Sequence, residues 1–196
     1  MYRIELSEGS LFSLKGVYLA PEYDPGELCV VDKILSDREE EALRFAASCL
    51  RAERQALRLV ARAEQTSRGL SRKLRQGGHA APCVAQVVAY LTEQAIISDY
   101  RYAQLWLRAR LSRKVESPRQ LMAALCSRSI DRDTAQEALA EVLEPDTEWA
   151  LLTRYVAKTP PPPDGFSIRQ TLKYQGFSPL VIDRACCHLP WRCIED

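Results

Sequence analysis

Four side chains that could bind a metal ion or act as nucleophiles lie close together late in the sequence: Cys186, Cys187, His188 and Cys193. Adjacent residues on a helix point about 100° apart, so Cys186 and Cys187 could not easily share one ion. The seven cysteines are odd in number and include no Cys-x-x-Cys pair, which favours free thiols in a reducing cytosol over a disulfide framework. We therefore expect a cytoplasmic protein with no metal site and no cofactor.

Catalytic motifs are absent from the sequence. There is no Walker-type loop, no Gly-x-Gly-x-x-Gly, no Gly-x-Ser-x-Gly and no His-Glu-x-x-His, each of which would place groups for a defined reaction. The two histidines, His79 and His188, fit surface or capping positions better than a catalytic base. A Cys–His nucleophile at Cys83 or Cys187 is the weakest alternative, and we expect the protein not to be an enzyme.

Arginine is the residue type whose spacing points to binding. Residues 44–132 carry 17 basic and 6 acidic groups, whereas residues 1–43 carry a net charge of −6 and residues 133–196 a net charge of −4. The planar guanidinium fork suits phosphate and carboxylate, and a concentrated basic region is the usual footprint of a polyanion. The middle of the chain is therefore predicted to face a polyanion such as single- or double-stranded DNA, although the whole chain has a net charge of only +1.

The arginines recur at helical spacing. Arg44, Arg51, Arg54, Arg58 and Arg62 are separated by 7, 3, 4 and 4 residues, and Arg68, Arg72 and Arg75 by 4 and 3, which places each set on one side of a helix. The alternative is a solvated face on which Glu53, Glu64 and Glu116 form ordinary local ion pairs. Among the nearby aromatic residues, Tyr102 and Trp106 fit an apolar core face, and Tyr100 is predicted to be exposed and free to stack on a base.

The elements that must position these side chains are mostly helical. Alternation at residues 3–6 and strand formers at 11–19 predict a small hairpin with a turn at 7–10. From Ser36, which can cap a helix, apolar residues follow three-and-four spacing. Helices are predicted over residues 37–65, 67–76, 81–94, 99–114, 117–128, 131–143, 145–158, 165–175 and 179–189, with a proline connector at 159–163.

A repeat is visible in the register of these helices. Three apolar pairs four residues apart, Leu70 and Leu74, Leu121 and Leu125, and Ile168 and Leu172, are each followed after four residues by a small residue: Gly78, Ser129 and Gly176. The spacings of 51 and 47 residues between these small residues fit a repeat architecture. We predict an all-α fold of three tandem three-helix repeats in an elongated array (36–97, 98–144 and 145–196), preceded by a β-hairpin region at 1–35.

At these residues the chain resembles the RecX family of regulatory proteins, which bind RecA–DNA filaments. The resemblance covers about residues 50–189. It is carried by residues 56–62 (ALRLVAR), 67–74 (SRGLSRKL), 97–103 (ISDYRYA), 117–121 (SPRQL) and 172–178 (LKYQGFS). The chain departs from the family pattern at Ser129, where glycine is usual.

The resemblance implies a non-catalytic modulator of recombination and repair. We expect the protein to be a monomer. It would lie in the groove of a RecA filament and limit filament growth, strand exchange and ATP hydrolysis. The residues expected to face the filament are Arg72, Lys73, Arg75, Arg101, Arg108, Arg110, Arg113, Lys114 and Arg119. The alternatives are an independent DNA-binding helical protein, in which the helix at 117–128 enters a groove, and a pure protein-interaction scaffold. No apolar run is long enough to span a bilayer, so no membrane partner is expected.

Overall fold

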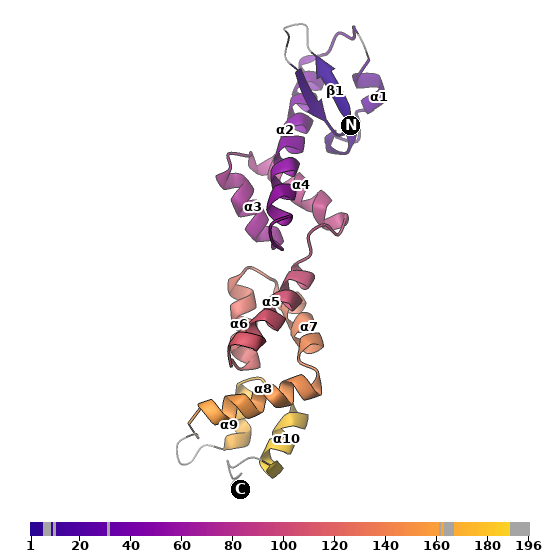
Figure 1. The fold of residues 1–196 in the computed structure, drawn as a ribbon. Helices are drawn as coiled ribbons and strands as arrows, with labels where there is room; N and C mark the ends of the chain where they lie inside the picture. Colours follow the sequence, from indigo (N-terminus) through magenta and orange to yellow (C-terminus); the bar gives the residue numbers. More distant parts are fainter. Residues whose placement is uncertain (6–8, 10, 31, 161, 163–166, 189–196) are drawn as a thin grey trace. The chain divides into compact units, whose positions relative to one another are not determined.

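The protein is mostly helical, with one small two-stranded sheet. A computed structural model describes residues 1–5, 9, 11–30, 32–160, 162 and 167–188. The chain divides into two compact units, Met1–Ser98 and Asp99–Asp196, coloured from indigo to yellow along the sequence in Figure 1. Each unit has its own cluster of buried apolar side chains. The elongated arrangement and the boundaries of the three repeats stay predictions.

Unit 1 begins with the predicted hairpin, which is shorter than the sequence indicated. Strands β1 (Tyr2–Glu5) and β2 (Leu11–Leu14) are antiparallel, with Tyr2 opposite Leu14. The prediction of strand up to residue 19 is wrong, because the backbone turns into a 3-10 helix η1 (Gly16–Tyr18) that carries Tyr18 into the core. A further short helix α1 spans Pro25–Leu28. Most of the predicted turn at residues 7–10 lies outside the described residues.

The hairpin region is joined to the long helix α2 (Asp37–Val60) by a buried polar cluster. Lys15 forms an ion pair with Glu53, whose side chain is buried on α2. The Lys15 ammonium also lies 5.5 Å from the centre of the Tyr90 ring, and Tyr18 packs edge-on against Tyr90 with ring centres 5.6 Å apart. Burial, and then the charge of Glu53, raise the pKa of Tyr18 far above its usual range. The cluster therefore holds the hairpin region against α2 through an ion pair whose carboxylate is buried.

Side-chain hydrogen bonds lie at both ends of α2. Its start is a capping box in which the Ser36 hydroxyl accepts from the Glu39 N–H while the Glu39 carboxylate accepts from the Ser36 N–H. These bonds, with Lys33, lower the pKa of Glu39 to about 2. The helix ends at Val60 rather than at residue 65, and beyond its end the Gln65 side-chain amide donates to the carbonyl of Ala63 at 2.9 Å.

The buried side of α2 changes along its length. Leu43 and Ala47 are buried in the first half, whereas Ala52 and Ala56 are buried further on, on a different side of the helix at about 100° per residue. The three-and-four spacing that the sequence shows from Ser36 onward therefore does not stay buried to its end: Leu57 is 38% exposed and Ala61 is exposed. Helices α3 (Ser67–Gln76) and α4 (Ala81–Glu93) both pack against α2.

Unit 2 contains six helices over the described residues. The first three are α5 (Asp99–Arg113), α6 (Pro118–Ser127) and α7 (Arg132–Val142), with α5 packed most extensively on α7. They are followed by α8 (Pro145–Lys158), α9 (Ile168–Tyr174) and α10 (Pro179–His188). Helix α9 starts later than predicted, and its predicted first residues fall among those not described. The buried Glu148 carboxylate ties α8 to the start of α10 by accepting 2.6 Å bonds from the N–H and hydroxyl of Ser178.

The predicted repeat register is present in the backbone. Gly78, Ser129 and Gly176 have positive φ angles of 86°, 67° and 86°. In each case the next residue donates its N–H to the carbonyl of the buried leucine that ends the apolar pair, Leu74, Leu125 or Leu172. This is the hydrogen-bond pattern of a left-handed helix cap. The equivalent apolar positions on α4, α7 and α10 are also buried: Val84, Ala135, Ile182, Val87, Ala138, Ala185, Leu91 and Val142.

Ser129 is the one member of this trio with a side chain at a left-handed position, which costs an L-residue about 1–2 kcal/mol. We expect Ser129→Gly to raise the free energy of unfolding of unit 2 by about 1 kcal/mol, whereas Ser129→Ala should give no such gain because it keeps the Cβ. All three tryptophans follow residue 98, so urea unfolding monitored by tryptophan fluorescence reports on unit 2. Equal stability of the two variants would contradict the assignment of backbone strain.

Gly176→Ala should have the opposite effect. A Cβ at this position would lie 3.3 Å from the backbone nitrogen of Arg119, which itself donates to the Gln175 carbonyl at 2.9 Å. The substitution adds both left-handed strain and a close approach between α6 and α9, so the urea midpoint should fall by more than Ser129→Gly raises it. An unchanged midpoint would show that the approach of the two backbones is not tight.

Candidate nucleic-acid interface

Helix α3 presents three arginines on the side opposite its core residues. Arg68, Arg72 and Arg75 fall within a narrow arc at about 100° per residue, and Leu70 and Leu74, both fully buried, fall on the other side of the helix. We call Arg68, Arg72 and Arg75 the α3 arginine face. All three are exposed, and within the described residues their side chains form no hydrogen bond or ion pair. Their positive charge is therefore available to an external anion.

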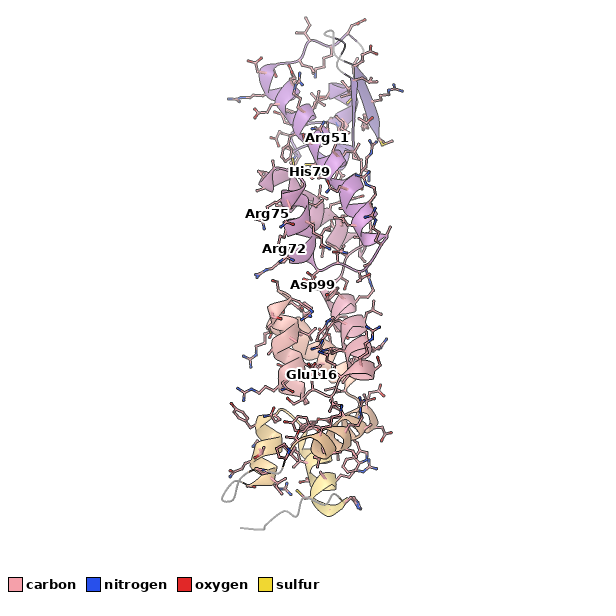
Figure 2. All side chains as sticks on the ribbon, turned by 60° about the vertical axis from the view of Figure 1, so that its left-hand side comes forward. Arg51, Arg72, Arg75, His79, Asp99 and Glu116 are labelled. Atoms are coloured by element: carbon pink, nitrogen blue, oxygen red, sulfur yellow. The ribbon has the colours of Figure 1, made fainter. Side chains whose placement is uncertain are left out.

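Two details of α3 differ from the predicted set. Arg68 has the same exposure and side as Arg72 and Arg75, and its spacing could have included it. Lys73, by contrast, lies at a different angle on the helix, and its ammonium donates to the buried Gln65 side chain at 2.7 Å. In the view of Figure 2, Arg72 and Arg75 extend outward from α3, with His79 beyond the helix end and Arg51 further along unit 1.

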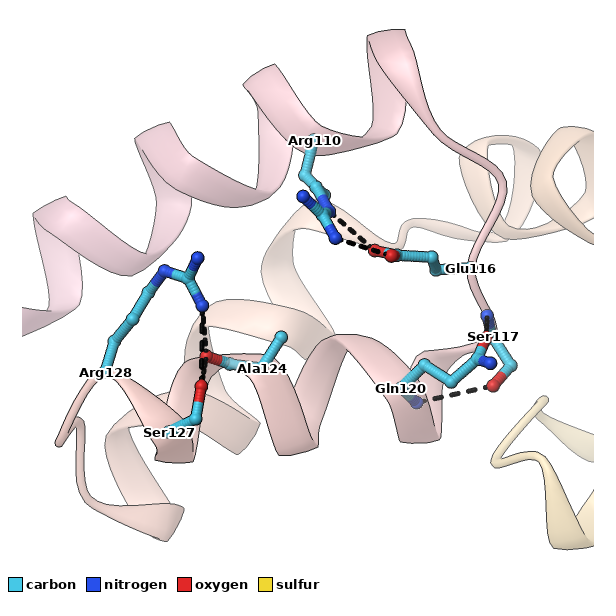
Figure 3. Close-up of polar contacts among 7 residues, drawn as sticks. All are labelled: Arg110, Glu116, Ser117, Gln120, Ala124, Ser127 and Arg128. Atoms are coloured by element: carbon cyan, nitrogen blue, oxygen red, sulfur yellow. Dashed lines mark hydrogen bonds and ion pairs between the residues drawn. The ribbon is translucent and has the colours of Figure 1, made fainter.

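Arg110 forms contacts within unit 2. It lies seven residues after the buried Ala103, on the same side of α5. Its guanidinium donates two bonds, of 2.7 and 2.6 Å, to the Glu116 carboxylate and lies 5.5 Å from the centre of the Trp106 ring. Figure 3 shows this bidentate pair between the end of α5 and the loop before α6. The ordinary local ion pair considered as the alternative reading is thus found here.

Trp106 also contacts a second guanidinium. Arg128 lies 4.4 Å from the ring centre and donates to the Ala124 carbonyl at 2.7 Å, a contact drawn in Figure 3. Two arginines therefore stack on one aromatic side chain, an arrangement that stabilises cations near a ring face. Trp106 and Tyr102 are half-buried and pack against the core of unit 2, as expected.

The expectation that Tyr100 is free to stack on a base is wrong. Tyr100 is half-buried and packs against the core of unit 2. Its hydroxyl donates to the Glu141 carboxylate of α7, and this bond, followed by burial, raises the pKa of Tyr100. The partner lies 41 residues away, so only the tertiary fold brings the two together.

The remaining basic residues of unit 2 are differently engaged. Arg108 is exposed and approaches Glu141 at 3.8 Å, and Arg101 is half-buried on the same side of α5. Arg113 and Lys114 are exposed at the end of α5. Arg119 is exposed and lies 3.8 Å over the Tyr174 ring. Unit 2 therefore offers an exposed basic set of Arg108, Arg113, Lys114 and Arg119.

The cysteine and histidine positions supply no reaction centre among the described residues. Cys49 and Cys83 are buried, whereas Cys187 and His188 are exposed at the end of α10. Cys186 is disulfide-bonded rather than a free thiol, contrary to the expectation, and Cys193 lies outside the described residues. His79 is bonded to Gln55 at 2.8 Å. In the described ranges no group of three or more His, Cys, Asp or Glu is placed to hold a metal ion, and no helix there could cross a bilayer.

Comparison with known proteins gives a consistent assignment. A family model described as the second three-helix domain of RecX matches residues 98–139. "Regulatory protein RecX" of Treponema pallidum (strain Nichols) is 30% identical over 150 residues, which cover 76% of this chain and 92% of that protein. The chain belongs to the RecX family of regulatory proteins. Members of this family are regulators and not enzymes.

Other relatives and solved structures agree with the family. A RecX of Mycobacterium sp. (strain JLS) is 34% identical over 106 residues, covering 54% of this chain and 52% of that protein. A crystal structure of regulatory protein RecX superposes with a TM-score of 0.58 at 20% identity, covering 77% of each chain. The RecX structure from Lactobacillus salivarius has a TM-score of 0.52 at 20% identity, with 72% of this chain and 96% of that chain covered. These two structures establish a RecX-like fold.

The Arg110–Glu116 pair predicts a pH-dependent contribution to stability. Bonds from Arg110 are the largest cause of the lowered pKa of Glu116 in the folded protein. The stabilisation is therefore complete above the ordinary glutamate pKa of about 4.3 and is lost as the pH falls through the lowered value. We expect Glu116→Gln to lower the urea midpoint of unit 2 at pH 7, and the difference from the natural chain to shrink under strongly acidic conditions.

A matched control is Glu144→Gln, because Glu144 is exposed and makes no side-chain capping bond at the start of α8. It should leave the midpoint nearly unchanged at both pH values. A Glu116→Gln deficit of the same size in neutral and acidic urea would mean that the pair contributes no titratable stabilisation.

Proposed function

We propose that this chain modulates RecA recombinase by binding RecA–DNA filaments, and that it mainly inhibits filament growth, ATP hydrolysis and strand exchange. Family membership supports a regulatory role connected with recombination. The observation that assigns this role to a particular surface is the α3 arginine face. It has three exposed guanidinium groups without a carboxylate partner among the described residues. A RecA–DNA filament is a polyanionic partner along which such a face gains charge-assisted bonds and counterion release.

The exposed basic set of unit 2, Arg108, Arg113, Lys114 and Arg119, is proposed to act with the α3 arginine face. Arg101, Lys73 and Arg110 complete the set expected from the sequence, but their contributions differ. Arg110 and Lys73 already donate to side chains of the protein, so a partner would have to compete for them. We propose that the protein acts as a cytoplasmic monomer and contacts single- and double-stranded DNA within the filament.

An independent DNA-binding protein is less well supported. In that alternative α6 would enter a groove and read bases, yet the side-chain oxygen of Gln120, in the first turn of α6, already accepts from the Ser117 N–H in a capping box. Side chains at the start of a recognition helix are the ones that contact base edges. Here Gln120 is engaged within the protein, which favours a partner recognised through charge over one read base by base.

The decisive experiment is a titration of the ATPase of the cognate RecA on single-stranded DNA. Arg72→Glu combined with Arg75→Glu should raise the concentration needed for half-inhibition by about tenfold or more, because two attractive charges become repulsive. The matched control is Arg38→Glu with Arg132→Glu, which makes the same change of charge at two exposed arginines in first helical turns, where glutamate is tolerated. The control should inhibit like the natural chain.

Two outcomes would overturn the proposal. Inhibition unchanged by the α3 double variant removes this face from the mechanism. Tight, salt-sensitive binding to bare DNA that is indifferent to RecA, together with absence of ATPase inhibition, would favour the independent DNA-binding protein instead.

A further inference from the structure

The hairpin does not close completely against α2. Between them lies a hollow of about 560 Å³, a volume within the range of small-molecule sites. It is lined by both strands and by two turns of α2: Met1, Tyr2, Arg3, Leu11, Ser13, Ala47, Leu50, Arg51 and Arg54. We call this the hairpin hollow. It involves residues of unit 1 alone, and Arg51 in Figure 2 marks its α2 side.

The charge lining the hairpin hollow is of one sign. Arg3, Arg51 and Arg54 line it, and no aspartate or glutamate does, although residues 1–43 are acidic overall. All three arginines are exposed. Within the described residues, the one hydrogen bond that their side chains form is from Arg51 to the Ser48 hydroxyl at 2.8 Å. Three guanidinium groups without a carboxylate among them leave an uncompensated positive charge in a concave site, which concentrates the field.

Two other hollows on unit 1 differ in this respect. A hollow of about 780 Å³ near Tyr18 and Phe45 is lined by Arg38 together with Glu41. Another, of about 500 Å³, is lined by Arg44, Arg51 and Glu41, and Arg44 is already paired with Glu40 at 2.6 Å. A carboxylate lies beside the arginines in both, so the hairpin hollow is the stronger attractor for an anion.

The hairpin hollow also offers an aromatic surface. Tyr2, on β1, lines the hollow and is 37% exposed. Single-stranded nucleic acids are bound by this combination of a positive groove that follows the phosphates and an aromatic ring on which a base stacks. A duplex keeps its bases paired and stacked, and therefore presents no free base face to Tyr2.

From this juxtaposition we propose that the hairpin hollow binds single-stranded nucleic acid, with Tyr2 stacking on a base and Arg3, Arg51 and Arg54 contacting phosphates. The site is separate from the α3 arginine face. It deepens the proposed function, on which its biological role rests, by giving the regulator its own contact with an unpaired strand. Arg51 also lines the neighbouring hollow at the Gly77–His79 turn that follows α3, so a bound strand could continue from the hairpin toward that turn.

An acidic protein segment is the competing occupant. It would use the three guanidinium groups equally well but would gain nothing specific from a planar aromatic ring. The contribution of Tyr2 therefore separates the two occupants, and Tyr2→Leu is the sharpest variant because it keeps an apolar side chain on β1 while removing the ring. Tyr2→Phe keeps the ring and serves as the conservative rescue.

The test measures binding of the full chain to fluorescein-labelled oligo(dT) by anisotropy over a range of salt concentrations. Tyr2→Leu should weaken binding about fivefold or more, the lower end of one base–aromatic stack, and Tyr2→Phe should bind like the natural chain. Arg3→Gln with Arg54→Gln should reduce the slope of log affinity against log salt by about 1.4, since each phosphate contact on a single strand contributes about 0.7. Arg38→Gln with Arg132→Gln is the charge-matched control and should leave the slope unchanged.

A second readout does not depend on affinity. An oligonucleotide carrying 4-thiothymidine, irradiated with the protein, should cross-link to the peptide containing Tyr2, and competition with unlabelled oligo(dT) should abolish the product. Oligo(dT) affinity and salt slope unchanged in both hairpin variants would overturn the proposal, as would an equal loss of binding to a duplex. A third result would also overturn the proposal: the variant with Arg3→Gln and Arg54→Gln captures less DNA-free RecA but binds oligo(dT) as tightly as the natural chain. The hollow would then bind an acidic protein surface.

The two experiments distinguish failure of the hairpin proposal from failure of the α3 mechanism. If the α3 double variant loses ATPase inhibition while the hairpin variants retain oligo(dT) binding, the hairpin proposal fails and the proposed function stands. If the hairpin variants lose oligo(dT) binding while the α3 variant inhibits normally, the hairpin site stands and the α3 mechanism fails.

Discussion

The residues with left-handed backbone that follow α3, α6 and α9 are the constraint on which the other features of the structure depend. At Gly78, Ser129 and Gly176 the backbone reverses, and the following N–H bonds the carbonyl of a buried leucine. This bond fixes the register between the middle helix and the helix that follows it. Because Leu70 and Leu74 are thereby held inward on α3, residues half a turn away must face solvent. The α3 arginine face is therefore a geometric consequence of core packing, and its exposure requires no separate device.

Charge pairing inside the protein decides which basic residues remain for a partner. A count along the chain treats every basic residue alike. In the structure, however, Arg110 donates to the Glu116 carboxylate and Lys73 donates to the Gln65 side chain. The arginines of the α3 face have no such partner among the described residues. Exposed ion pairs contribute little to stability, typically below about 1 kcal/mol, but they remove donors from the surface. The functional surface is thus smaller than the basic block in the sequence, and it is defined by what the fold leaves unpaired.

Local patterns predicted most of the fold and part of the candidate site. The hairpin, the long first helix with its Ser36 cap, and the three positions needing a small residue followed from periodicity and turn chemistry, because these features are encoded within a few residues. The inward position of Arg110 was available in principle, since it lies seven residues after Ala103 on the same side of α5. The bond from Tyr100 to Glu141 and the hairpin hollow were not available, because both join segments about 40 residues apart or more that only tertiary packing brings together.

The hairpin illustrates why charge totals by segment mislead. The acidic excess of residues 1–43 is partly consumed locally: Glu39 caps α2 and pairs with Lys33, and Glu40 pairs with Arg44. The cation Lys15 is in turn taken up by the buried Glu53, and this pair helps hold the hairpin region to α2. Once the region is held there, Arg3 joins Arg51 and Arg54 around one hollow that no carboxylate lines. Residues 1–43 have a net negative charge, yet they complete a site for anions. Several of their carboxylates cap a helix or form ion pairs, whereas Arg3 lies beside Arg51 and Arg54 of α2.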